Sequence, residues 1–152
     1  MTLIQTIQTP VAAAISELIP RLRATAVLLS NTGAERADDY VEQVVRDLCA
    51  GDMSDTDDIT IRSFRLLRHH VRADKRHVTT ASHILDGGNK LRLALAQCSL
   101  GQREAILLQA SGFKYRDIAD ICGVEIGTVR SRINRGKTTL NRLFEERPET
   151  LQ

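Results

Sequence analysis

The sequence predicts an all-α fold made of two small helical domains joined by a linker, the second of them a helix-turn-helix domain. Apolar residues recur at spacings of three and four along most of the chain, which indicates amphipathic helices. Charge is divided unevenly, since residues 1–90 carry a net charge of −1 and residues 91–152 carry +3. Uneven charge of this kind suggests two domains and an anionic partner. We therefore expect domains at 1–76 and 91–152, with a linker at 77–90.

The first domain is expected to hold helices over 11–19, 34–49 and 59–73. Pro10 suits a first helical turn. Pro20 either kinks the first helix or begins another that runs to about Leu29. The segment 34–49 has the clearest apolar stripe, formed by Ala37, Tyr40, Val41, Val44, Val45 and Leu48.

The second domain is expected to hold four short helices, over 90–98, 102–111, 115–122 and 127–145. Gly112 and Gly123 are well placed as left-handed helix caps. The last two helices, joined by a tight turn that contains glycine, have the arrangement of a helix-turn-helix. In such a motif the second helix enters the DNA major groove and presents its first residues to the base edges.

The last helix separates apolar from basic residues. At 100° per residue, its apolar side holds Val129, Ile133, Leu140, Leu143 and Phe144. The opposite side holds Arg130, Ser131, Asn134, Arg135 and Arg142. Five basic residues and no acidic ones lie between Glu125 and Glu145. The helix therefore excludes acidic side chains where a phosphate would approach, although a basic helix that docks on an acidic protein is the alternative.

The side chains of this helix suggest separate roles in DNA binding. Arg130 and Arg135 suit paired hydrogen bonds to guanine. Arg132 and Lys137 suit phosphate contacts, which position a helix without reading sequence. The helix N-terminus at Thr128 can also receive a phosphate.

Other functional classes find little support. Three distant cysteines fit a reducing cytosol, and we expect a soluble, cytoplasmic protein with no signal peptide and no membrane span. The histidines, His69, His70, His77 and His83, lack the spacing of a metal site. The acidic loop 51–58 lacks the glycine and final glutamate of a calcium loop. We expect no enzyme activity, no cofactor and no small-molecule substrate.

Three stretches of the second domain resemble region four of bacterial extracytoplasmic-function sigma factors. They are 102–108 (QREAILL), 112–119 (GFKYRDIA) and 127–137 (GTVRSRINRGK), and the resemblance is closest to the general-stress-response branch of alphaproteobacteria. It implies that the last helix reads the minus-35 promoter element. The base-facing residues would be Arg130, Ser131, Asn134 and Arg135.

The first domain resembles region two of the same family through 18–23 (LIPRLR) and 37–41 (ADDYV). This resemblance implies contacts with core RNA polymerase, for which the candidates are Asp38, Asp39, Glu42 and Gln43. The stretch 63–68 (SFRLLR) is similar to the helix that holds and melts the minus-10 element. Candidates for contacts with that element or with single-stranded DNA are Arg65, Arg68, His69 and Arg72.

Three functions are compatible with these features. The first is a sigma factor that recruits RNA polymerase to stress promoters and is controlled by an anti-sigma factor. The second is a sigma-like decoy that binds an anti-sigma factor without starting transcription, because the tryptophan expected near Ser63 is absent and Phe64 suits the core. The third is a DNA-binding regulator with a helix-turn-helix and an interaction domain. The acid-free last helix argues against the decoy.

Overall fold

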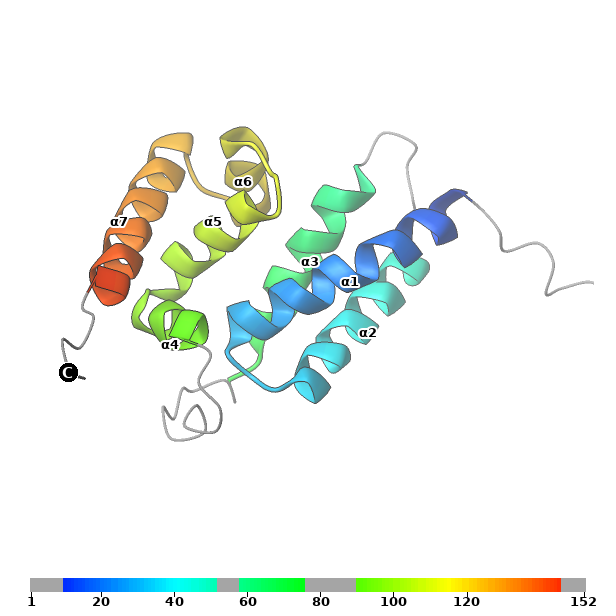
Figure 1. Cartoon of the computed structure of the whole chain (residues 1–152). Helices are drawn as coiled ribbons and strands as arrows, with labels where there is room; N and C mark the ends of the chain where they lie inside the picture. The colour runs from blue at the N-terminus through cyan, green and yellow to red at the C-terminus, as the bar shows by residue number, and fades with distance from the viewer. Residues whose placement is uncertain (1–9, 52–57, 76–89, 146–152) are drawn as a thin grey trace, which may run out of the picture. The chain divides into compact units, whose positions relative to one another are not determined.

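The computed structural model describes residues 10–51, 58–75 and 90–145 (Figure 1). Every regular element within these ranges is an α-helix, so the predicted all-α fold is confirmed. The chain divides into two compact units, Met1–His77 and Val78–Gln152. Most of the expected linker, 77–89, lies outside the described residues, and Lys90 already begins a helix.

The described residues of the first unit form three helices that pack against one another, α1 (Pro10–Ser30), α2 (Ala34–Ala50) and α3 (Ile59–Ala73) (Figure 1). Five of the six residues of the predicted stripe on α2 are buried, namely Ala37, Tyr40, Val41, Val44 and Leu48, whereas Val45 is half-buried. Helix α3 begins after Asp58, whose carboxylate accepts hydrogen bonds from the backbone N–H groups of Thr60 and Ile61. The hydrophobic effect of these buried stripes holds the unit together.

Helix α1 continues through Pro20 without interruption. Proline has no N–H, so the carbonyl of Ser16 lacks its usual donor four residues along. Both Ser16 and Pro20 are exposed, and water can therefore satisfy this carbonyl. Of the two outcomes that the sequence allowed at Pro20, the single helix is the one found.

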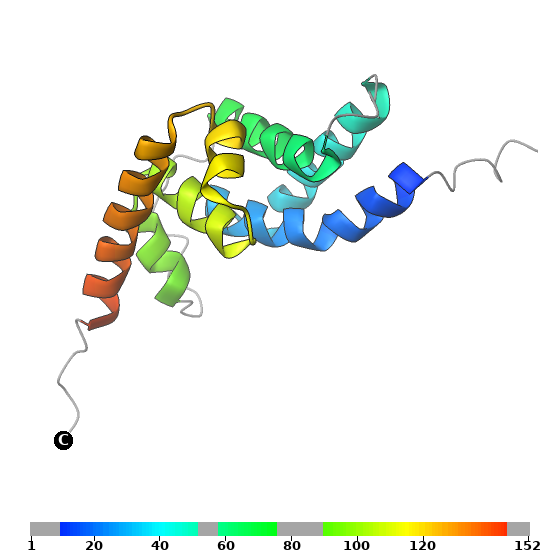
Figure 2. The ribbon, with the colours of Figure 1, turned by 90° about the horizontal axis from the view of Figure 1, so that it is seen from above.

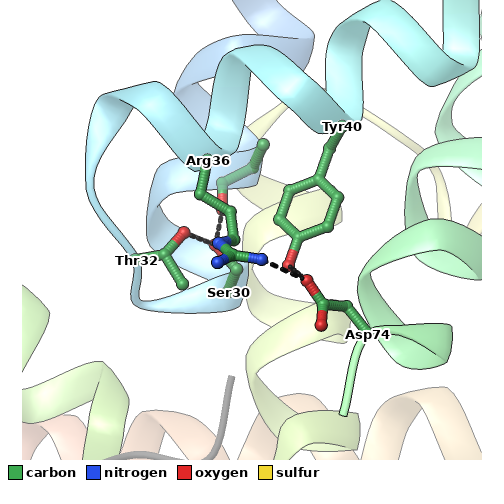
Figure 3. Close-up of polar contacts among 6 residues, drawn as sticks. Ser30, Thr32, Arg36, Tyr40 and Asp74 are labelled. Carbon is green, nitrogen blue, oxygen red and sulfur yellow. Dashed lines mark hydrogen bonds and ion pairs between the residues drawn. The ribbon is translucent and has the colours of Figure 1, made fainter. Parts of the chain in front are cut away.

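Hydrogen bonds fix the C-terminal end of α3 against α2 (Figure 3). The carboxylate oxygen Oδ2 of Asp74 accepts from Nη1 of Arg36 at 2.8 Å and from the hydroxyl of Tyr40 at 3.0 Å. One turn earlier, Nε2 of His70 lies 2.7 Å from Oδ2 of Asp47. Because Tyr40 is buried, its hydroxyl needs such a partner. The last two turns of α3 are thereby tied to α2.

Over residues 90–145, the second unit contains α4 (Lys90–Gln97), α5 (Leu100–Ala110), α6 (Tyr115–Cys122) and α7 (Ile126–Glu145) (Figure 2). Helix α7 is the longest of these four helices and contacts each of the other three. Helix α5 begins two residues earlier than predicted because Ser99 and Gln102 form a capping box. The sequence signal for this start is Ser-x-x-Gln before an apolar run.

Candidate nucleic-acid interface

The turn between α6 and α7 is set by Gly123. This glycine has φ 65° and ψ 39°, in the left-handed region that favours glycine. The N–H of Val124 then donates to the carbonyl of Ala119 at 3.1 Å and closes the end of α6. Gly112 also has a positive φ, 93°, so both glycines take the left-handed conformation expected of them. The result is two helices joined by a tight turn, as in a helix-turn-helix.

Helix α7 buries one side and exposes the other. Val129, Ile133 and Gly136 are buried against the rest of the unit. The predicted site residues exposed on the remaining surface are Arg130, Ser131, Asn134, Arg135 and Lys137. Thr128 is half-buried at the start of the helix. The helix thus presents five of its seven predicted DNA-binding residues together to solvent.

The exposed side of α7 is strongly electropositive. Within the part of the chain that the structure describes, no ion pair involves Arg130, Arg135 or Lys137. The helix has no acidic residue before Glu145. Uncompensated positive charge on one face attracts polyanions and is typical of a nucleic-acid footprint.

Phe144 departs from the predicted apolar side. It keeps 40% of its surface exposed, and Nζ of Lys90 lies 5.0 Å from its ring centroid. The last turn of α7 therefore extends beyond the core of the unit. Leu140 and Leu143, on the same apolar side, are half-buried.

Arg132 lies in a different environment from Lys137, although the sequence predicts the same role for both. Its side chain is half-buried, and its Cζ lies 3.0 Å from the point that a Cβ on Gly101 would occupy. Its Nη1 is fully buried and has no hydrogen-bond partner among the described residues. The glycine at the start of α5 thus makes room for this guanidinium. A helical wheel of α7 alone contains no sign of this contact.

Beneath α7, side chains of the second unit pack closely against Gly136. A Cβ on Gly136 would collide with Cδ1 of Ile106 on α5. The thiol of Cys98 lies 3.9 Å from the carbonyl oxygen of Gly136. Burial raises the pKa of Cys98, and the nearby Arg103 opposes this with a smaller effect. Burial also lowers the pKa of Arg103. The thiol stays protonated at neutral pH and acts as a packing group.

In the first unit, the four predicted minus-10 residues share one face of α3. Their spacing of three and four residues places them side by side along the helix. Arg65, His69 and Arg72 are exposed, whereas Arg68 is half-buried. The structure therefore brings these four residues together as a basic stripe.

The aromatic residues of the first unit are both in its core. Phe64 is 1% exposed and Tyr40 is 2% exposed. The guanidinium carbon of Arg21 lies 5.6 Å from the centroid of the Phe64 ring. The expectation that Phe64 suits the core is confirmed, and neither ring can stack on a DNA base in this conformation.

The predicted polymerase-contact residues lie together on α2. Asp38, Asp39 and Glu42 are exposed, and Gln43 is half-buried. Two of them belong to exposed ion pairs, Asp38 with Arg23 at 2.7 Å and Glu42 with Arg46 at 2.6 Å. Such pairs contribute little to stability and leave the carboxylates accessible.

Other kinds of site find no counterpart in the described ranges. No group of three or more histidine, cysteine, aspartate or glutamate side chains is placed there to hold a metal ion. None of the helices in these ranges has both the length and the apolar character that a membrane crossing requires. An open hollow of about 600 Å³ lies at the α6–α7 turn, between Arg116, Asp120, Glu125 and Thr128.

Comparison with known proteins identifies the family. Residues 88–140 match the family described as "Sigma-70, region 4", which covers the helix-turn-helix. The chain is also 34% identical over 146 residues to the ECF RNA polymerase sigma factor EcfG of Rhodopseudomonas palustris (strain TIE-1). This similarity covers 83% of the chain and 80% of the relative. The chain belongs to the extracytoplasmic-function RNA polymerase sigma factors.

Two solved structures share its architecture. The sigma factor RpoE of Bartonella quintana, in complex with the anti-sigma factor NepR, has a TM-score of 0.71 and 28% identity, covering 89% of this chain and 96% of that one. CnrH, in complex with the cytosolic domain of CnrY, has a TM-score of 0.73 and covers 89% of this chain and 87% of that one. At 22% identity, CnrH supports the fold alone. The resemblance to the alphaproteobacterial stress branch and the sigma-factor function are both confirmed.

Proposed function

We propose that this sigma factor directs core RNA polymerase to stress promoters by placing α7 in the major groove of the minus-35 element. The main support is the acid-free, exposed side of α7, backed by the fully buried Val129 and Ile133. A helix held rigidly on one side and basic on the other can enter the groove without rearranging.

Each residue on that face has a role in the proposal. Arg130 and Arg135 donate paired hydrogen bonds to guanine. Lys137 and the N-terminal turn at Thr128 hold phosphates. The predicted phosphate role of Arg132 competes with its packing on Gly101, and the salt dependence of DNA binding separates the two.

The first unit binds polymerase and the minus-10 region in this proposal. Three acidic side chains of α2 contact the polymerase core together with Gln43. They are Asp38, Asp39 and Glu42. The stripe on α3, formed by Arg65, Arg68, His69 and Arg72, holds the DNA backbone. Since Tyr40 of α2 and Phe64 of α3 are both buried, neither of these rings takes part in this contact.

Regulation by an anti-sigma factor is also part of the proposal. The sigma factor RpoE of Bartonella quintana, 28% identical to this chain, was solved with the anti-sigma factor NepR. We propose that this chain is held by a protein of the same kind in the cytoplasm until a stress signal releases it. No cofactor and no catalytic step of its own is required.

Run-off transcription with purified core polymerase and a stress-promoter template tests the proposal. The wild-type chain should support a transcript of defined length, and Arg135→Ala should abolish most of it. Arg142→Ala is the matched control, because Arg142 is an exposed arginine in the last turn of the same helix. Tight binding of an anti-sigma factor with no transcript at any template would instead favour the decoy.

A further inference from the structure

We propose that the ion pair between Arg36 and Asp74 keeps two surfaces of the first unit distinct in charge, an acidic one on α2 and a basic one on α3. This inference rests on the proposed function, in which the acidic surface contacts polymerase and the basic surface contacts DNA. In Figure 3 the guanidinium of Arg36 points toward the carboxylate of Asp74, and its Nη1 lies 2.8 Å from Oδ2.

Both charges lie at the unfavourable end of their own helix. Arg36 is in the first turn of α2, where the helix dipole favours anions. Asp74 is the C-cap of α3, at the end where the dipole favours cations. Neither helix alone therefore accounts for its charge, whereas the pair formed across the two helices does.

On α2, Arg36 has the opposite sign to the exposed carboxylates of its helix. The exposed acidic residues of α2 are Glu35, Asp38, Asp39 and Glu42. The second arginine of this helix, Arg46, forms an ion pair with one of them, Glu42. Since Arg36 is paired with Asp74, its positive charge is neutralised and does not repel the basic groups that an acidic surface attracts.

On α3, the carboxylate of Asp74 is the exception. It is the only acidic residue between positions 59 and 75, a range that contains the whole basic stripe. Its side chain is only 11% exposed, and both Arg36 and the hydroxyl of Tyr40 hold it against α2. The last residue of the stripe, Arg72, is two residues away, within the screening length of about 10 Å at moderate salt. Arg36 thus prevents this carboxylate from weakening the attraction of the stripe for DNA.

The test compares Arg36→Gln with Asp74→Asn, because loss of either partner leaves the other charge unpaired. Arg36→Gln should weaken holoenzyme binding to promoter DNA about two- to fivefold and leave binding of the full chain to core polymerase unchanged or tighter. Asp74→Asn should weaken core binding by a similar factor and leave DNA binding unchanged or tighter. Both losses should shrink at high salt. Holoenzyme formed with an excess of the chain keeps core affinity out of the DNA measurement.

Tyr40→Phe is the matched control. It removes a hydrogen bond of 3.0 Å to the same oxygen of Asp74 but changes no charge. If the contact only anchors α3, all three substitutions should weaken both kinds of binding. If it separates the charges of the two surfaces, Tyr40→Phe should leave both binding constants unchanged.

A double variant, Arg36→Gln with Asp74→Asn, removes both charges and leaves two amides that can still hydrogen-bond. It should bind core polymerase and DNA as the wild type does, and it decides the matter if thermal unfolding shows that a single variant does not fold. The proposal is overturned if the single variants change both affinities in the same direction or not at all, or if the double variant binds either partner more weakly. If the wild-type chain does not bind core polymerase, the proposed function fails and this inference fails with it.

Discussion

Helices α3 and α7 are both basic, but their polar side chains differ in their contacts with the rest of the unit. On α7, Arg130 and Arg135 reach solvent with no ion pair among the described residues. On α3, His70 is bonded to Asp47, and the end of the helix is tied to α2 through Asp74. The face of α7 mixes long arginines with the short Ser131, whereas the stripe on α3 consists of three arginines and His69. In the proposed function, the stripe on α3 contacts the DNA backbone and the mixed face of α7 reads bases.

The largest expected effect concerns the aromatic residue of α3. Phe64→Ala should lower the free energy of unfolding of the first unit by about 3–5 kcal/mol, because it leaves a cavity under Arg21. Phe64→Leu should cost less than about 1.5 kcal/mol and leave promoter opening intact. Denaturant titration and permanganate footprinting measure the two quantities. Normal stability together with a loss of opening in Phe64→Leu would show that the ring stacks on DNA after all.

The next effect distinguishes base recognition by α7 from phosphate contact by α3. Arg135→Ala should weaken holoenzyme binding to promoter DNA by about 1–3 kcal/mol and relax the preference at one base pair. Arg65→Ala on α3 should weaken binding to all sequences alike, as expected for a phosphate contact. Competition binding with promoter and unrelated duplexes measures both. A sequence-dependent loss in Arg65→Ala would contradict the division between the two helices.

A smaller effect concerns how α3 is anchored. Tyr40→Phe removes the hydroxyl that donates to Asp74 and should destabilise the first unit by about 1 kcal/mol. Thermal unfolding measures the change, and Glu17→Gln, an exposed position on α1, is the control. A Tyr40→Phe chain as stable as the wild type would show that the bond between Arg36 and Asp74 is sufficient alone.

The smallest effect separates two basic residues of α7. Lys137→Gln should reduce the slope of log binding constant against log salt concentration by about 1, because one phosphate contact is lost. Arg132→Gln should leave this slope unchanged and lower the thermal stability of the second unit, because its guanidinium packs on Gly101. Equal slopes for Arg132→Gln and Lys137→Gln would restore the phosphate role of Arg132.

The spacing of apolar residues predicted the helices well, because it depends only on the helix itself and on which of its sides is buried. Helices α2 and α3 end within a residue of the expected positions. Pro20 was ambiguous because the cost of a missing N–H depends on whether water reaches the carbonyl of Ser16. The early start of α5 was predictable in principle, because Ser99 and Gln102 form the Ser-x-x-Gln pattern of a capping box.

The candidate site was predictable as a face and less so residue by residue. The exposed positions of Arg130 and Arg135 follow from the burial of Val129 and Ile133 on the same helix. The position of the Arg132 side chain cannot be inferred from α7 alone, because it depends on Gly101 of α5. Contacts between helices are long-range in sequence, and a wheel of one helix contains no information about them.

The left-handed backbone of Gly123 limits which mutations the turn between α6 and α7 can tolerate. Most other residues would bring a Cβ into a conformation that costs about 1–2 kcal/mol, and rotating α7 relative to α6 would relieve this strain. Alleles that lose promoter recognition are therefore expected at this glycine as well as at the arginines. In the proposed function, selection for promoter recognition therefore acts on the backbone torsion angles of this turn as well as on the residues proposed to contact the bases.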